Sequence, residues 1–399
     1  MKKLMILGGI KYQVPVIQTA HELGYYVITG DFLPDNIAHK YSDEYCNVSI
    51  IDKEAVLNAA QKLKIDGIMS FACDPGVTTA AYVAEKMGLP SVGSYESVCI
   101  LQNKGKFRKF LTDNGFNVPM AKQYKRKEDA LHDIDLFHWP VIVKPTDSAG
   151  SKGVTKVTDV KQLPAAIDYA LSKSFSKEFI IEDFLEKIGC SSDTDCFSTN
   201  GKLVLADFNA QRFDLNADNP YVPAAYTWPT TISKQHEEEL RSELQRLMSL
   251  LNLKTSIYNV ETRECVDGKA YIMECTPRGG GNRLAEMIRY ATGVDMIKAA
   301  VLGAVGENVP DISQKPYDGY WAILILHADK IGIFDHLWIN EDIRDNVVET
   351  DLWIKDGDPV NGFTGSNDTI GTMVLRFDSQ EMMENVFQNV SNYVKLILK

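Results

Sequence analysis

The sequence lacks the signals of secretion, membrane insertion and disulfide stabilisation. Its seven cysteines are an odd number without a CxxC pair, which is typical of reduced thiols. The seven histidines show neither HExxH nor another paired spacing, so the spacing predicts no zinc site. No apolar run reaches the roughly 20 residues of a membrane span, and the run after Met1-Lys2-Lys3 stops at Gly8-Gly9, which does not predict a secretory signal. We therefore expect a cytoplasmic protein without a membrane partner.

Positive charge is also scarce. The 42 Lys and Arg residues are outnumbered by 54 Asp and Glu residues, which gives a formal net charge of -12. A net acidic surface repels phosphate backbones, so we expect no nucleic-acid partner. The apolar content of 45% is ordinary for a globular protein. A chain of 399 residues is too long for one core and predicts two or three packed lobes.

The two common nucleotide-binding glycine motifs are absent as well. The first turn reads Gly8-Gly9-Ile10-Lys11-Tyr12-Gln13, which lacks the G-x-G-x-x-G fingerprint, and no P-loop motif occurs in the chain. What the first hundred residues do contain is short apolar strands alternating with helices of about ten residues. This alternation predicts a doubly wound α/β domain with a parallel sheet, whose ligands would lie beyond the carboxyl ends of the strands. Asp31 and Asp74 fall at such ends.

From about Lys104 the pattern changes to mixed strands and helices. A strand ending in Lys144 leads into a loop of small residues up to Gly153. Glycine and small residues let backbone N–H groups approach phosphate oxygens, and a lysine supplies charge for the same phosphates. On its own, the loop is more typical of an ordinary flexible hairpin. The next strand ends in Glu182-Asp183, where a purine could lie, although a plain buried strand fits the segment too.

The strongest local feature is a hairpin that carries two carboxylates. Asp267-Gly268 predicts a tight turn between strands at 256–263 and 270–275, which would bring Glu261 and Glu274 together. Two adjacent carboxylates repel unless a cation lies between them, and Mg²⁺ accepts such ligands when phosphate oxygens complete its shell. Arg278 then stands where it could hold a phosphoryl group. Toward the end of the chain, residues 380–398 predict one amphipathic helix.

Taken in order, these motifs resemble the ATP-grasp superfamily, and most closely its carbamoyl-phosphate synthase, biotin carboxylase and L-amino acid ligase branch. The resemblance spans nearly the whole chain and rests on Asn103-Lys104, Trp139-Pro-Val-Ile-Val-Lys144-Pro, Asp147–Gly153, Ile181–Leu185 and Glu261 with Glu274-Cys-Thr-Pro-Arg278. It implies an ATP-grasp fold of α/β and α+β class. The implied parts are a pre-ATP-grasp α/β domain at 1–102, an ATP-grasp domain at 103–312 with a flap subdomain at about 120–185, and a mixed α/β subdomain at 313–399.

The resemblance also implies a set of ATP contacts. Lys104 and Lys144 would contact the phosphates. Glu182 would accept from the adenine amine. The remaining implied contacts are the flap residues Ser148, Gly150, Ser151 and Gly153, the residues at the ring edge Asp183, Phe184 and Leu185, and Asp193. The family often binds ribose through a glutamate that is missing here, and Asp193, Asp195 or Glu186 would take its place.

The metal ligands and catalytic residues follow from the same resemblance. Glu261, Glu274 and Thr276 would hold Mg²⁺, with Mn²⁺ as an alternative ion. Arg278, together with Lys144, would be catalytic and would stabilise the transferring phosphoryl group. Thr276 replaces the family's usual asparagine, and its hydroxyl would be a weaker ligand.

The implied activity is ligation of a small-molecule carboxylate to an amine or ammonia through an acyl-phosphate, with ADP and phosphate as products. The resemblance is compatible with a homodimer. A bicarbonate-activating carboxylase or carbamoyl-phosphate-type enzyme is the first alternative. A non-catalytic ATP sensor is the second, favoured only by Thr276. A dehydrogenase is opposed by the missing glycine fingerprint.

Overall fold

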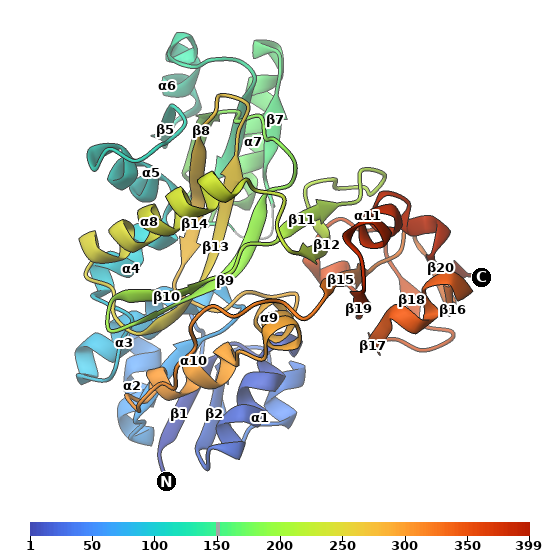
Figure 1. Cartoon of the computed structure of the whole chain (residues 1–399). Coiled ribbons are helices and arrows are strands. Elements are labelled where there is room, and N and C mark those ends of the chain that lie inside the picture. The colour runs from blue at the N-terminus through green and yellow to red at the C-terminus, as the bar shows by residue number, and fades with distance from the viewer. Residues whose placement is uncertain (149–151) are drawn as a thin grey trace. The chain divides into compact units, whose positions relative to one another are not determined.

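The computed structural model describes residues 1–148 and 152–399 (Figure 1). They form two compact units, each assembled from three stretches of the chain. The first unit comprises Met1–Val118, Asp193–Asp207 and Ser233–Lys315, and the second comprises Pro119–Ser192, Phe208–Ile232 and Pro316–Lys399. The division into domains at 102 and 312 stays a prediction.

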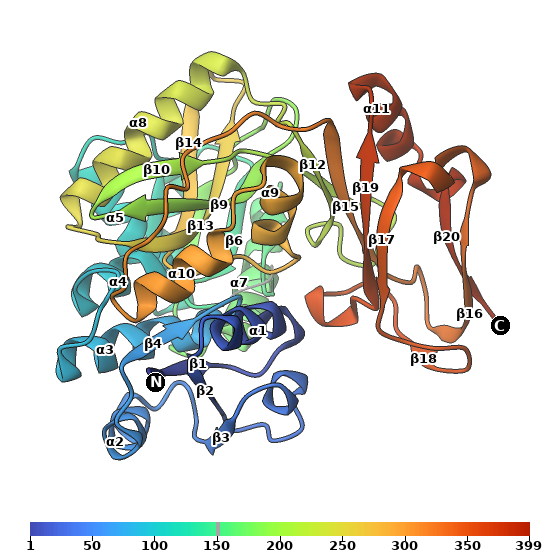
Figure 2. The same ribbon diagram turned by 60° about the horizontal axis from the view of Figure 1, so that its bottom comes forward.

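The first unit begins with the predicted doubly wound sheet. Its strand order is β3-β2-β1-β4, and all three pairings are parallel. Successive residues of β1 point to opposite faces: Leu4 and Ile6 belong to one apolar core, and Met5 and Leu7 to the other. Helices α1, α9 and α10 contribute to the first core, and α2 and α3 to the second (Figure 2). The elements are β1 (Lys3–Leu7), α1 (Val14–Glu22), β2 (Tyr26–Asp31), β3 (Glu44–Asn47), α2 (Lys53–Leu63), β4 (Gly67–Ser70) and α3 (Val77–Met87).

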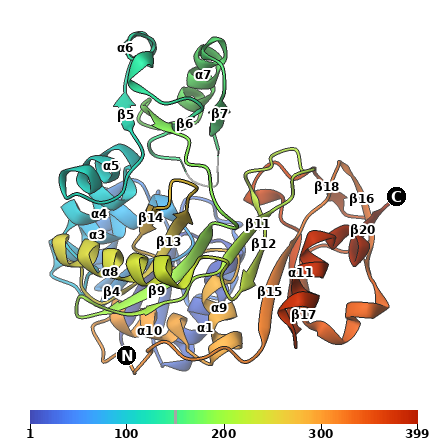
Figure 3. The ribbon, with the colours of Figure 1, turned by 45° about the horizontal axis from the view of Figure 1, so that its top comes forward.

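A second sheet completes the first unit, in the order β10-β9-β13-β14. Asp267-Gly268 joins the predicted hairpin and Asn200-Gly201 joins a second one, and both glycines have positive φ. The amphipathic helix α8 packs on this sheet (Figure 3). The elements are α4 (Tyr95–Gln102), α5 (Lys104–Asp113), β9 (Ser192–Thr199), β10 (Lys202–Ala206), α8 (Lys234–Leu250), β13 (Ser256–Glu264), β14 (Ala270–Thr276), α9 (Leu284–Thr292) and α10 (Met296–Ala304).

The second unit contains the antiparallel sheet that follows α5. Its order is β5-β8-β6-β7. Helix α7 covers one face, where Ile167 and Ala170 meet Val141, Val143 and other buried strand residues. The elements are β5 (Ala121–Tyr124), α6 (Lys127–His132), β6 (Val141–Pro145), β7 (Thr155–Val157), α7 (Leu163–Lys173) and β8 (Phe179–Asp183).

The rest of the second unit is built on a five-stranded sheet, β11-β12-β15-β19-β17, with a smaller sheet, β18-β16-β20. Helix α11 packs on β15 and β19, where Met383 and Val386 are buried. The elements are β11 (Ala210–Phe213), β12 (Pro223–Trp228), β15 (Tyr320–Leu326), β16 (Gly332–Ile339), β17 (Val347–Leu352), β18 (Pro359–Val360), β19 (Gly371–Phe377), α11 (Gln380–Gln388) and β20 (Val394–Leu398).

The single helix predicted for residues 380–398 is wrong. The helix ends at Gln388, and residues 394–398 form β20, which pairs antiparallel with β16. A short apolar run such as Val394-Lys-Leu-Ile-Leu398 fits either a strand or a buried helix segment. Here the segment forms a strand because it pairs with an edge of β16, and the local sequence does not reveal that pairing.

Candidate active site

The β13–β14 hairpin brings together the two carboxylates that the sequence singles out. The antiparallel register places Glu261 directly opposite Glu274, and Asn259 directly opposite Thr276. Directly opposed side chains lie on the same face of a sheet with Cβ atoms about 4.5–5.5 Å apart. Residues 259 and 261 also share a face because they are two apart on one strand. The hairpin therefore presents two carboxylates, an amide and a hydroxyl on one face.

Basic side chains meet both carboxylates. Lys104 Nζ lies 2.5 Å from Glu274 Oε1, and Arg263 Nη2 donates to Glu261 Oε1 at 3.2 Å. Lys104 is the first residue of α5, whose N-terminus is capped by the Asn103 side chain, an acceptor of the Lys106 N–H at 2.9 Å. Like charges directly opposed on a hairpin destabilise it. The two basic residues offset that repulsion.

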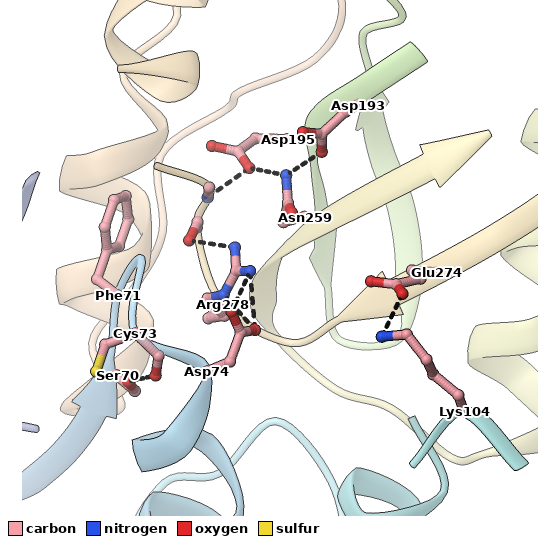
Figure 4. A network of polar contacts seen from close by, with 12 residues as sticks. Ser70, Phe71, Cys73, Asp74, Lys104, Asp193, Asp195, Asn259, Glu274 and Arg278 are labelled. Carbon is pink, nitrogen blue, oxygen red and sulfur yellow. Dashed lines mark hydrogen bonds and ion pairs between the residues drawn. The ribbon is translucent and has the colours of Figure 1, made fainter. Parts of the chain in front are cut away.

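Arg278 follows β14 and is held by Asp74, from the loop after β4 (Figure 4). Its Nε and Nη2 each donate to one oxygen of the Asp74 carboxylate at 2.9 Å, and its Nη1 donates to the Gly279 carbonyl at 3.0 Å. Burial alone would lower the pKa of the guanidinium, but Asp74 raises it above its usual value, so the group stays a cation. A bidentate pair also fixes the plane of the guanidinium.

A second polar network lies on β9 and β13 (Figure 4). Asn259 Nδ2 donates to Asp193 Oδ1 at 2.8 Å, and the Gly280 N–H donates to Asp195 Oδ1 at 2.7 Å. Asp195 is completely buried, and burial raises its pKa to about 7 although the Gly280 N–H and Arg278 oppose the rise. Its Oδ2 has no hydrogen-bond partner among residues 1–148 and 152–399. Asp193, predicted near a ribose, thus belongs to the group around Asn259.

In the second unit, Lys144 and Glu182 form a buried ion pair. Lys144 Nζ lies 2.7 Å from Glu182 Oε2, and the side chains are 11% and 1% exposed. The two residues come from adjacent strands, β6 and β8, whose antiparallel register places Glu182 opposite Ile142, two residues before Lys144. The structure therefore joins a predicted phosphate ligand to the predicted adenine ligand of the same unit.

The residues after Glu182 are fixed by hydrogen bonds of their own. The Asp183 carboxylate accepts from the His138 N–H at 2.9 Å, and the Phe184 N–H donates to the Pro140 carbonyl at 3.0 Å. Lys156 Nζ lies 3.7 Å from the centre of the Phe184 ring. Because the Phe184 N–H is engaged, a contact from this residue to a purine amine would use its carbonyl. Leu185 is half-buried beside it.

The predicted flap is described in part. Ser148 is half-buried, while Gly150 and Ser151 lie outside the described residues. Gly153 has a φ of +80°, and a Cβ at this position would lie 2.7 Å from the Pro145 ring. Both facts require glycine where the chain returns into β7.

Comparison with known proteins identifies the domain that carries these residues. The family model described as "ATP-grasp domain" matches residues 137–286. The chain contains an ATP-grasp domain. Of the predicted site, the match includes Lys144, Glu182, Glu261, Glu274 and Arg278, while Lys104 lies before it.

Among curated proteins, the chain is similar to carbamoyl phosphate synthase large chains. It is 24% identical over 334 residues to the C-terminal section of that chain from Aquifex aeolicus, covering 79% of this chain and 60% of the relative. It is 27% identical over 281 residues to the large chain from Thermoanaerobacter, covering 68% of this chain and 24% of the relative. The chain thus spans less than two thirds of the length of these relatives.

Solved structures share the fold over the whole chain. An L-amino acid ligase from Bacillus licheniformis superposes with a TM-score of 0.81 at 19% identity, covering 100% of this chain and 99% of that one. A phosphoribosylglycinamide synthetase from Anaerococcus prevotii gives 0.78 at 22% identity, covering 100% of both chains. A biotin carboxylase domain from Hydrogenobacter thermophilus gives 0.75 at 14% identity, covering 100% of this chain and 91% of that one. The predicted ATP-grasp fold is confirmed. Among the described residues, no helix is long and apolar enough to cross a membrane.

Two residues near the ATP-grasp carboxylates escaped the sequence argument. Asn259 and Arg263 alternate with Glu261 along β13, so a period of two placed all three on one face. Asp74 was a candidate for substrate contact, and the structure places it against Arg278. In the second unit, the Gln211 backbone N–H donates to the Ser191 carbonyl, and Arg212 forms an ion pair with Glu384.

Proposed function

We propose that this chain is an ATP-dependent ligase that joins a small carboxylate to an amine or ammonia, with an acyl-phosphate intermediate and with ADP and phosphate as products. The observation that carries the proposal is the Glu261–Glu274 pair, opposed on one hairpin of an ATP-grasp domain, with Lys104 on one carboxylate and Arg278 two residues past the strand. The relatives and the similar solved structures include enzymes that are named as ligases or synthetases.

The residues on the hairpin face fit a hard divalent cation. Two carboxylates, the Thr276 hydroxyl and the Asn259 amide offer oxygen ligands, which Mg²⁺ and Mn²⁺ accept. Thr276 was considered a weak replacement for asparagine, but an asparagine side chain is present on the directly opposed residue. Bound Mg²⁺ would neutralise charge on the transferring phosphoryl group. Glu261, Glu274, Thr276 and Asn259 are the residues that we propose to hold it.

Lys104, Lys144 and Arg278 are the cations that we propose to act on ATP. A carboxylate oxygen of the substrate attacks the γ-phosphorus, the bond from that phosphorus to the ADP oxygen breaks, and the electron pair leaves with ADP. The amine then attacks the acyl carbon, phosphate leaves, and the amine loses a proton. Positioning and charge stabilisation supply most of the rate acceleration of phosphoryl transfer. A guanidinium fixed in one plane by Asp74 meets that need.

On the nucleotide side, we propose that Glu182 and the carbonyl of Phe184 accept from the adenine amine and that Lys144 contacts a phosphate. The proposal is supported by the ion pair that joins Lys144 and Glu182 across adjacent strands, and by the position of Phe184 directly after β8. Lys144 already has a carboxylate partner in Glu182. A phosphate contact would therefore share or replace that ion pair.

Two further properties belong to the same proposal. The free cysteines fit a reducing compartment, so we place the enzyme in the cytoplasm. Its partners would be the carboxylate and the amine, and a homodimer is the assembly that the resemblance favours.

The decisive measurement is release of ADP and phosphate with Mg²⁺ and ATP across pools of carboxylates and amines. We expect release that needs one member of each pool and that Glu274→Ala abolishes. Glu341→Ala, which removes an exposed carboxylate from a surface turn, should leave it unchanged. AMP and pyrophosphate as products would refute the acyl-phosphate mechanism. Turnover that needs bicarbonate would favour the carboxylase alternative, and nucleotide binding without turnover in any pool would favour a sensor.

A further inference from the structure

A second group of ligand-type side chains lies in the second unit, and none of them belongs to the proposed ATP site. Asp214 follows β11, and His327 and Asp329 follow β15. One ligand atom from each of the three lies within 4.8 Å of the others. The spacing of the histidines along the sequence did not predict this group, because Asp214 and His327 are 113 residues apart in the chain.

The sheet topology explains why these residues meet. β12 lies between β11 and β15 and is antiparallel to both (Figure 1). The carboxyl ends of β11 and β15 therefore emerge at the same edge of the sheet. Asp214 is the first residue past one end, and His327 is the first residue past the other. The ligands are thus anchored on a rigid scaffold.

The backbone fixes the tautomer of His327. Its Nδ1 lies 2.7 Å from the Ile325 carbonyl, which only accepts, so the proton of a neutral ring is on Nδ1. The ring stacks on Phe363 with centroids 4.0 Å apart, and the side chain is only 9% exposed. The Nε2 lone pair is then the group that faces Asp214. Histidines that bind metals are oriented in this way, with the other ring nitrogen donating to a carbonyl or carboxylate.

The distance between the two ligands fits a metal ion. His327 Nε2 and Asp214 Oδ2 are 3.3 Å apart. A lone pair facing a carboxylate is repulsive unless a cation lies between them. A shared proton normally gives a charge-assisted hydrogen bond of about 2.7–2.9 Å. Neighbouring ligands around an ion with bonds of about 2.0–2.1 Å are instead about 3.0–3.4 Å apart. The observed separation is compatible both with a hydrogen bond from a protonated ring and with two ligands on one ion.

The surrounding charge favours a cation as well. Asp218 lies close by, because a side chain at Gly362 would meet its carboxylate, and Gly362 forms a bridge with Ala328, between His327 and Asp329. In the described part of the chain, no Lys or Arg forms an ion pair with Asp214, Asp218 or Asp329. Three carboxylates close together without a Lys or Arg partner repel one another, and a divalent ion removes that repulsion.

We propose that Asp214, His327 and Asp329 form a binding site for a divalent transition-metal ion such as Zn²⁺, Co²⁺ or Mn²⁺. A set of one imidazole and two carboxylates suits these ions better than Mg²⁺ or Ca²⁺, which take oxygen ligands alone. The ion would clip the segment between β11 and β12 to the end of β15. This site is independent of the proposed ligase activity.

The test is titration of the metal-stripped full-length protein with Co²⁺, followed by its visible absorption, and with Zn²⁺ by calorimetry. We expect saturable binding that His327→Ala and Asp329→Asn each weaken at least tenfold. Asp329 is exposed, so its substitution should leave the fold intact and keep the test valid if His327→Ala is unstable.

Two controls separate this site from other metal binding. His336→Ala removes an exposed histidine that lies 3.1 Å from Asp335, and it should leave the titration unchanged. Glu274→Ala should leave the part of the titration that depends on His327 unchanged, since that variant affects only the proposed Mg²⁺ site. Binding that survives both His327→Ala and Asp329→Asn, or no saturable binding below millimolar Co²⁺, would refute the site.

Discussion

At the scale of single residues, neighbouring groups and burial set the charge state of the side chains in the candidate active site. Arg278 and Asp74 are 204 residues apart in the chain and yet form a bidentate pair. Asp195 carries a carboxyl group into a completely buried position, and only one of its oxygens has a hydrogen-bond partner among the described residues. These two carboxylates lead to different predictions, one on the reaction rate and one on the dependence of stability on pH.

Asp74→Asn should lower kcat with a smaller effect on KM. The variant keeps the shape of the side chain but removes the charge that fixes the Arg278 guanidinium, and hydrogen bonds to charged groups contribute about 1.5–3 kcal/mol. We therefore expect kcat to fall roughly 10- to 100-fold. Steady-state kinetics of ADP release would measure this effect. Asp113→Asn removes a surface partner of Lys109 and should be neutral. An unchanged kcat would show that Asp74 does not position Arg278 for catalysis.

Asp195→Asn should abolish a loss of stability as the pH rises. The pKa of Asp195 is raised to about 7 in the folded protein by burial, whereas an unfolded aspartate titrates near about 4. Between those values, the folded state holds a proton that the unfolded state has released. The stabilising contribution is therefore complete below about pH 4 and is lost as the pH rises toward 7.

Denaturant unfolding of the wild type and Asp195→Asn across this range would measure the difference. We expect the wild type to lose stability relative to the variant, by on the order of 4 kcal/mol at most. Asp342→Asn, on an exposed turn, serves as the control. Parallel curves for wild type and Asp195→Asn would contradict a raised pKa.

A contact in the candidate active site can be predicted from the sequence only where the two residues lie close together along the chain. The proximity of Glu261 and Glu274 is predictable because a short turn joins their strands, and the strand alternation also reveals Asn259. Their direct opposition is not, because the register next to the turn would pair Glu261 with Met273 and a register shift after Glu261 places it opposite Glu274. The contact of Asp74 with Arg278 is set by the packing of two sheets, and no local pattern encodes it. The same reason hides the Asp214–His327 contact.

At the scale of elements, the β6–β8 pair shows how a sheet accommodates a buried charge. Glu182 sits at the end of an apolar strand and is compensated by Lys144 from the neighbouring strand. The prediction of β8 succeeds because its apolar run is short and bounded. The C-terminal prediction fails because residues 394–398 form a similar run, and only pairing with β16 makes it a strand. An apolar segment thus predicts burial more securely than it predicts the type of element.

Lys144→Met should destabilise the protein by about 3–5 kcal/mol, because it leaves the Glu182 carboxylate buried without its cation. The double variant Lys144→Met with Glu182→Leu should recover most of that loss, since an apolar pair of similar volume costs little in a buried position. Thermal and denaturant unfolding would measure both variants. If the double variant is as unstable as the single one, the pair does not act as a unit. Lys125→Met, at an exposed ion pair with Glu178, provides a matched control that should change stability by less than about 1 kcal/mol.

At the scale of the whole molecule, the residues assigned to ATP come from both compact units. Lys104, Glu274 and Arg278 belong to the first, and Lys144 and Glu182 belong to the second. The sequence predicts the fold of each unit well, because strand and helix periods are local. It does not predict how three stretches of chain assemble each unit.

ADP with Mg²⁺ should stabilise the protein by about 2.7 kcal/mol at a hundred times its Kd, because a ligand that binds only the folded state shifts the unfolding equilibrium. Glu274→Ala, which removes a proposed Mg²⁺ ligand, and Glu182→Gln, which changes the proposed adenine contact, should each reduce the rise in Tm. Scanning calorimetry with and without nucleotide would measure it. A rise that one of these variants leaves intact would remove that residue from the nucleotide site. His327→Ala should keep the full nucleotide effect and lose only the stabilisation by Zn²⁺, because independent sites without shared partners contribute additively.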